Sequence, residues 1–206
     1  MKIQNNNNQA VAALLVAGLI VVAAVYRVVS ATSFPDLPNF SPVMAMAFCG
    51  AFFLPAVWAF FVPLAAVLIS DIALAMMIGY PALSVGAATG WFCVAVAVVT
   101  GRWLATRGNR GALPLLTGLL ANSVFFYLAT NAASWIGNPA YAKNAAGLVQ
   151  ALTVGLPGYP PTWMFFRNSL ISDILFAGLI LGVYVLATKF VPSKHDAAHP
   201  AFSTKA

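Results

Sequence analysis

The apolar run AVWAFFVPLAAVLISDIALAMMI (residues 56–78) contains one acidic residue, at the end of the tetrapeptide Leu68-Ile69-Ser70-Asp71. The same tetrapeptide recurs 102 residues later (173 − 71) and ends at Asp173, again inside an apolar run. A helix over such a run is long enough to cross the roughly 30 Å of hydrocarbon in a bilayer. An ionisable side chain is costly at that depth, so Asp71 and Asp173 are candidates for a functional site.

The composition of the chain is typical of membrane-spanning helices. Hydrophobic residues make up 62% of the 206 residues and charged residues only 7%, whereas a soluble domain carries about 25% charged residues. The predicted fold class is therefore all-α, a polytopic transmembrane bundle of about six spanning helices. The net charge of +6 does not indicate nucleic-acid binding, because Lys and Arg concentrate at the ends of the apolar runs.

Proline residues and turn signals divide the chain into six predicted spans within one transmembrane domain, residues 9–191. Residues 1–8 and 192–206 are predicted to be disordered tails, the second one cytoplasmic. The segment 138–161 is rich in Pro and Gly and is expected to re-enter or cap the bundle. The predicted spans are about 9–29, 42–54, 56–78, 84–104, 112–136 and 163–190.

Basic residues predict that both termini lie on the inner side of the membrane. The side that holds the N-terminus would carry seven Lys and Arg residues, against Arg27, Lys143 and Arg167 on the other side, and cytoplasmic loops are the ones enriched in such residues. The first span has an alternative interpretation as a signal peptide with Val29-Ser30-Ala31 as its cleavage site. Its length and the basic residue that closes it favour a retained helix.

Polar side chains are expected to meet in the outer half of the bundle. Asp71 lies seven residues before the end of its span near Ile78, and Asp173 lies seven residues after the start of its span near Phe166. Both are therefore about 10 Å deep at about 1.5 Å per residue. An apolar, aromatic pocket with a few placed polar groups is typical of small-molecule sites. The predicted substrate-binding residues are Asp71, Asn131, Asp173, Asn39, Thr130 and Trp135.

Structural roles for the two aspartates are an open alternative. They can cap broken helices, or pair with Arg27 or Arg167. The repeated tetrapeptide is also compatible with an inverted repeat of three plus three helices, or with chance in so apolar a chain. Ala13 and Ala17 form a small-xxx-small pair that lets two helices approach closely.

Enzymatic chemistry is not expected. The chain has no Glu and no HExxH, GxSxG or GxxxxGK[ST] motif, although a membrane hydrolase that uses both aspartates remains a distant alternative. Cys49 and Cys93 do not form a CxxC pair, so neither a metal site nor a cofactor is predicted.

The run PNFSPVMAMA (residues 38–47), with Phe125-Phe126, Thr130-Asn131, Trp135 and the two Ser-Asp pairs, resembles an uncharacterised bacterial membrane family. That family is similar to the substrate-binding (S) components of energy-coupling-factor vitamin transporters in its six-helix layout, its size, its Ala13/Ala17 pair and its long first outer loop. The resemblance implies a multi-pass protein of the bacterial inner membrane with a pocket for a vitamin or its precursor near the outer face. It also implies that a transmembrane coupling protein with ATPases contacts Ala13 and Ala17.

Two functional hypotheses follow. The first is the solute-binding component of an uptake transporter for a vitamin or another small molecule, in which two carboxylates would suit a cationic or multiply hydroxylated solute. The second is a structural or assembly subunit that binds a protein partner and no solute. Substitution of the aspartates would lower solute affinity in the first case, and folding yield or complex assembly in the second.

Overall fold

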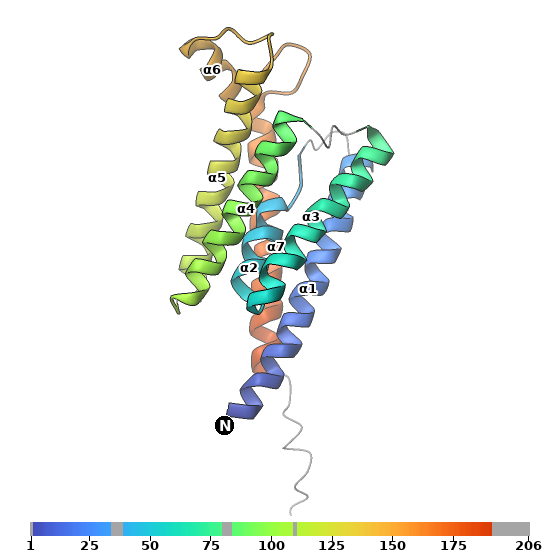
Figure 1. Cartoon of the computed structure of the whole chain (residues 1–206), viewed down its shortest axis with the longest axis vertical. Coiled ribbons are helices and arrows are strands. Elements are labelled where there is room, and N and C mark those ends of the chain that lie inside the picture. The colour runs from blue at the N-terminus through green and yellow to red at the C-terminus, as the bar shows by residue number, and fades with distance from the viewer. Residues whose placement is uncertain (1, 34–38, 80–83, 109–110, 191–206) are drawn as a thin grey trace, which may run out of the picture.

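The computed structural model describes residues 2–33, 39–79, 84–108 and 111–190, and the regular structure in these ranges is entirely α-helical, as predicted (Figure 1). Five of the helices are long and apolar enough to cross a membrane, so the chain is a multi-pass membrane protein. In the described residues the helices are α1 (Lys2–Ser33), α2 (Val43–Phe53), α3 (Ala56–Ile78), α4 (Val85–Thr106), α5 (Ala112–Gly137), α6 (Ala145–Leu152) and α7 (Thr162–Phe190).

The helix in the second predicted span is too short to cross the membrane. Helix α2 has 11 residues and is therefore about 16 Å long at about 1.5 Å per residue, against roughly 30 Å of hydrocarbon. Figure 1 shows that residues 39–42, which we call the segment before α2, descend into the bundle before the helix begins. The predicted turn near Pro55 is correct, because α2 ends at Phe53 and α3 begins at Ala56.

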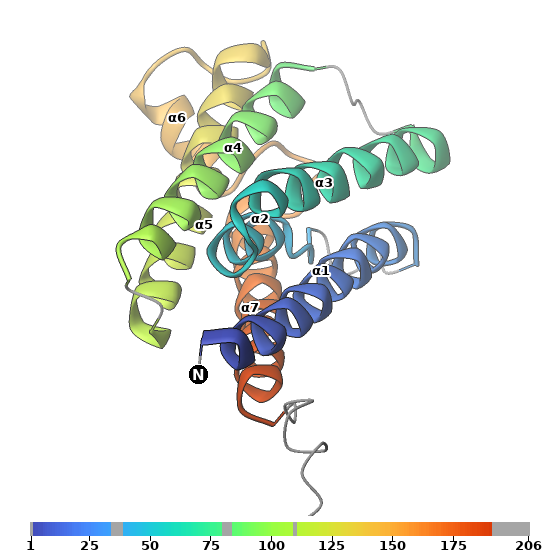
Figure 2. The same ribbon diagram turned by 60° about the horizontal axis from the view of Figure 1, so that its bottom comes forward.

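Helix α2 is the centre of the bundle. It packs against all five long helices, and its ten residues from Met44 to Phe53 are all buried. Figure 2 shows it between α4 on one side and α1 and α3 on the other. A helix that is apolar on every side fits such an interior position, so the surface that would otherwise meet lipid meets other helices.

Glycine residues of α2 and of the surrounding helices allow these helices to pack closely. A Cβ at Gly101 of α4 would lie 2.5 Å from the carbonyl oxygen of Phe48, and a Cβ at Gly50 would lie 2.5 Å from Pro63 Cγ of α3. Both distances are too short for non-bonded atoms. The Phe48 ring also packs against Gly118 of α5. Three helix interfaces around α2 thus depend on positions without side chains.

The ends of the chain partly differ from the prediction. Helix α1 begins at Lys2, so residues 2–8 are helical instead of disordered, and the helix continues through the possible cleavage site to Ser33. The predicted C-terminal tail, 192–206, lies outside the described residues. The start of α1 and the end of α7 lie at the same end of the bundle (Figure 1), as the predicted topology requires. The segment 138–161 contains α6, packs against α5 and α7 and lies at the opposite end, which we call the α6 end (Figure 1).

Candidate functional site

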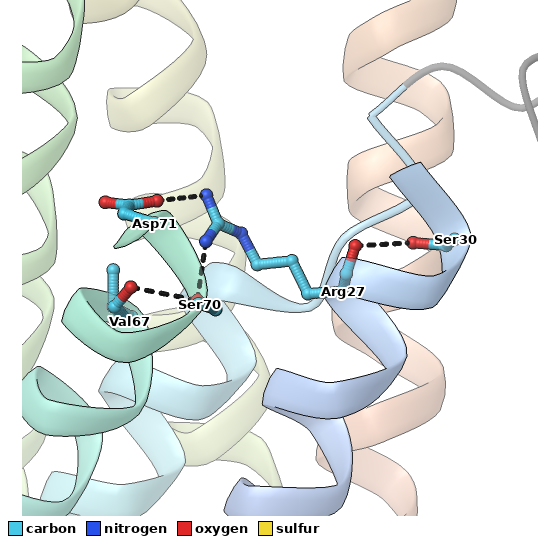
Figure 3. A network of polar contacts seen from close by, with 5 residues as sticks. All are labelled: Arg27, Ser30, Val67, Ser70 and Asp71. Atoms are coloured by element: carbon cyan, nitrogen blue, oxygen red, sulfur yellow. Dashed lines mark hydrogen bonds and ion pairs between the residues drawn. The ribbon is translucent and has the colours of Figure 1, made fainter. Parts of the chain in front are cut away.

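An ion pair joins α1 to α3 in the half of the bundle nearer the α6 end. Arg27 Nη2 lies 2.6 Å from Asp71 Oδ1, and Arg27 Nη1 donates a 2.6 Å hydrogen bond to Ser70 Oγ (Figure 3). Ser70 Oγ donates in turn to the Val67 carbonyl oxygen at 2.9 Å. The side chains of Arg27 and Asp71 are only 11% and 9% exposed, so each charge depends on the other for compensation.

This pair lines a cavity of about 350 Å³, which we call the ion-pair cavity. Helices α1, α3 and α4 and the segment before α2 form most of its wall. Ser41, on that segment, has a buried hydroxyl group with no hydrogen-bond partner among the described residues. The charged and polar residues of the wall are Arg27, Asp71, Ser30, Asn39 and Ser41, and its aromatic residues are Phe40, Trp91 and Phe126.

A second cavity, of about 510 Å³, lies beneath the segment 138–161. We call the segment the cap and this space the cap cavity. Its wall comes from α4, α5, the cap, the start of α7 and Asn39, and none of the described residues that line it is charged. The polar and hydroxyl-bearing residues that line it are Asn39, Thr130, Asn131, Ser134, Asn138, Tyr141, Tyr159 and Thr162.

The two predicted polar residues of α5 are held by their own helix. Thr130 Oγ1 donates to the Phe126 carbonyl oxygen at 2.7 Å, and Asn131 Nδ2 donates to the Tyr127 carbonyl oxygen at 2.8 Å. Across the cavity, burial raises the pKa of the Tyr141 phenol above its usual value. This phenol therefore stays protonated at neutral pH and keeps its hydrogen-bond donor.

Asn39 lies on the wall of both cavities. Its φ of 60° is in the left-handed region, and its carbonyl oxygen accepts a 2.8 Å hydrogen bond from the Ser41 N–H. Asparagine adopts this conformation more readily than most residues. The tight turn that results directs the chain toward the start of α2.

Asp173 lines neither cavity, whereas Asp71 lines the ion-pair cavity, so the structure does not bring the two carboxylates together at one cavity. The Asp173 side chain is fully buried. Oδ1 accepts from the Ala45 N–H at 2.9 Å and Oδ2 accepts from Ser123 Oγ at 3.1 Å. Ala45 is the third residue of α2, where backbone N–H groups have no partner within the helix. Asp173 therefore caps α2 from a neighbouring helix, because its carboxyl oxygen accepts a hydrogen bond from a backbone N–H at the start of that helix.

Trp135 also lies outside both cavities. Its Nε1 donates to the Ala142 carbonyl oxygen at 2.8 Å, and Lys143 Nζ donates to its carbonyl oxygen. The Tyr127 hydroxyl donates to the Leu152 carbonyl oxygen at the far end of α6. These three contacts fasten the cap to α5. Trp135 therefore holds the cap in place, and its role in substrate binding stays a prediction.

The small-residue pair of α1, Ala13 and Ala17, points partly into the helical bundle. Ala13 and Ala17 are half-buried and pack against the core, beside the fully buried Ala12, Val16 and Ile20. Leu14 and its neighbours on the opposite face are exposed. Any protein that contacted α1 would therefore meet the exposed face and only the edges of the two alanines.

Sequence reasoning missed some of the site. Arg27 entered only as a possible partner of an aspartate, and Trp91 was not considered for the pocket. Both lie on different helices from Asp71, so no spacing along the chain connects them. Cys49 and Cys93 are buried and free. Within the described ranges no three His, Cys, Asp or Glu side chains gather as metal ligands.

Comparison with known families gives one match. The sequence profile of the Family of unknown function (DUF6580) matches residues 6–195. The chain belongs to this family. The match covers every residue that lines the two cavities and agrees with the predicted membership of an uncharacterised membrane family. Comparisons with curated proteins and with solved structures gave no match.

Proposed function

We propose that this membrane protein binds a small solute in the ion-pair cavity. The observation that carries the proposal is the buried Arg27–Asp71 pair on a cavity wall, beside the aromatic rings of Phe40, Trp91 and Phe126. An ionisable pair within a membrane-spanning bundle is costly and marks a functional site by default. Apolar and aromatic walls with a few fixed polar groups are the usual surroundings of a bound small molecule.

The charges of the wall favour a solute without net charge. Asp71 is neutralised by Arg27, and Asp173 is engaged at α2, so the earlier argument that two carboxylates suit a cation does not apply. A lone charge would find no unpaired counter-charge among the described residues of the wall, so its entry would be costly. A neutral solute with both donors and acceptors can use the guanidinium N–H groups, the Asp71 carboxylate and the Ser41 hydroxyl.

The same proposal includes a role in uptake, as the solute-binding component of a transporter for a vitamin or another small molecule in a bacterial inner membrane. The likeness to energy-coupling-factor S components supports it, together with the position of both cavities toward the α6 end, which the distribution of basic residues predicts to be outside. In this role a transmembrane coupling protein with ATPases would contact the exposed face of α1 around Leu14.

Native mass spectrometry of protein extracted from its host in mild detergent tests binding. Ala87 lines the ion-pair cavity and is buried, so Ala87→Phe would fill the space. Ala88 is exposed and lines neither cavity, so Ala88→Phe is the matched control. The proposal expects a reproducible small-molecule adduct in the wild type and in Ala88→Phe, and its loss in Ala87→Phe. An adduct that persists in Ala87→Phe would contradict binding in this cavity.

The second candidate is an assembly subunit whose polar residues hold helices together. Two of the six predicted binding residues, Asp173 and Trp135, make internal structural contacts, and this observation favours it. This candidate predicts a stoichiometric membrane-protein partner and no adduct in the same spectra. A partner that proved to be a coupling protein with ATPases would instead support the uptake proposal.

A further inference from the structure

The ion-pair cavity and the cap cavity share a wall. Asn39, Gly90 and Phe126 line both spaces, and they come from the segment before α2, from α4 and from α5. A Cβ at Gly90 would lie 4.0 Å from Phe126 Cε2. The Phe126 ring therefore lies beside the backbone of α4, with no opposing side chain at that position.

We propose that the cap cavity is the vestibule of the ion-pair cavity, and that the Phe126 ring against Gly90 is the barrier between them. The inference rests on the proposed function only for the identity of the solute that passes. The wall has the features of a barrier that opens at low cost, because one of its sides is a glycine and the ring is only half-buried. The ring packs against the hydrophobic core, but it is not fully buried and can still change rotamer, so a small displacement of the ring would join the two spaces.

The chemistry of the two spaces fits an ordered entry. The described residues of the cap cavity offer hydroxyl and amide groups and no charged side chain, so a hydrated neutral solute can exchange water for weak hydrogen bonds there. The ion-pair cavity offers the stronger, charge-assisted donors and acceptors of Arg27 and Asp71. Asn39 closes the third side of the wall in a left-handed conformation, and such conformations persist where the surrounding structure holds them.

Cysteine accessibility tests the route without knowledge of the solute. Cys49 and Cys93 are replaced by Ala, and one new cysteine is introduced into each variant as a reporter. The variants are reconstituted in proteoliposomes and exposed to a membrane-impermeant methanethiosulfonate. Val43→Cys reports on the ion-pair cavity and Ser134→Cys on the cap cavity, because each residue lines only that space. Labelling of Ser134→Cys also measures the fraction of molecules with the α6 end outward.

Gly90→Leu fills the shared wall, and Phe126→Ala opens it. Gly86→Leu is the matched control, because Gly86 lies one turn earlier on α4 and lines the cap cavity alone. We expect Gly90→Leu to abolish labelling of Val43→Cys while Ser134→Cys stays reactive. Phe126→Ala should accelerate the labelling of Val43→Cys, and Gly86→Leu should leave that labelling unchanged. Unchanged labelling of Val43→Cys in Gly90→Leu would overturn the proposal. So would a Val43→Cys that stays unreactive even in Phe126→Ala while Ser134→Cys reacts.

Discussion

Removal of one member of the Arg27–Asp71 pair is expected to cost far more stability than removal of both. At the observed 2.6 Å between Arg27 Nη2 and Asp71 Oδ1, the attraction is about 6 kcal/mol at an effective dielectric constant of about 20. Desolvation of the two buried groups offsets much of this attraction. Arg27→Met or Asp71→Leu leaves the remaining charge buried and uncompensated, and the expected loss is about 3–5 kcal/mol for each. The double variant leaves no unpaired charge and is expected to lie much closer to the wild type.

The measurement is the free energy of unfolding in mixed micelles, with increasing SDS and helix content followed by circular dichroism. Lys189→Met is the control, because Lys189 is exposed in the last turn of α7, so loss of its charge should cost at most about 1 kcal/mol. A double variant that loses the sum of the two single losses would show no coupling between the charges and would refute the reasoning.

The double variant also separates a structural role of the pair from a role in binding. If Arg27 and Asp71 bind the solute, the double variant folds but its mass spectrum lacks the adduct. If the pair only joins α1 to α3, the double variant keeps the adduct. The double variant is more informative than Asp71→Leu alone, because in the single variant a missing adduct can result from lost binding or from lost folding.

Three further outcomes follow from the packing. Asp173→Ala should destabilise the fold by about 3 kcal/mol, because the Ala45 N–H and the Ser123 hydroxyl both lose their buried acceptor. Asp173→Asn should lose less in the same SDS titration, because its amide oxygen still caps α2. Gly101→Leu should prevent folding, since a Cβ there meets backbone at 2.5 Å, whereas Gly182→Leu, with nothing within 4 Å, should give normal yield on size-exclusion chromatography. Trp135→Phe removes one hydrogen bond to the cap, at a cost of about 1 kcal/mol in stability. It should speed amide hydrogen exchange in the cap and leave the solute adduct intact. Unchanged exchange in the cap would show that other contacts hold it.

Hydropathy was sufficient for most of the fold. A membrane-spanning helix satisfies its own backbone hydrogen bonds, so its existence depends on local sequence. Helices α3, α4, α5 and α7 follow the predicted ranges within two residues, and α1 extends beyond its predicted range at both ends. The second span was the exception. Residues from Val43 to Phe53 are apolar on every side, and hydropathy does not distinguish a helix surrounded by lipid from one surrounded by other helices. Its flanking prolines, Pro42 and Pro55, were the local sign that it is short.

The two aspartates show what the sequence by itself determines and what it does not. It determined that both lie within membrane-spanning helices, because the apolar runs around them extend far enough to cross a bilayer. It could not assign their roles, since both end the same tetrapeptide. Only the tertiary structure placed Asp71 against Arg27 at a cavity and Asp173 against the free N–H groups at the start of α2. The physical reason is that the environment of a buried charge is set by the helix packed opposite, which no local pattern specifies.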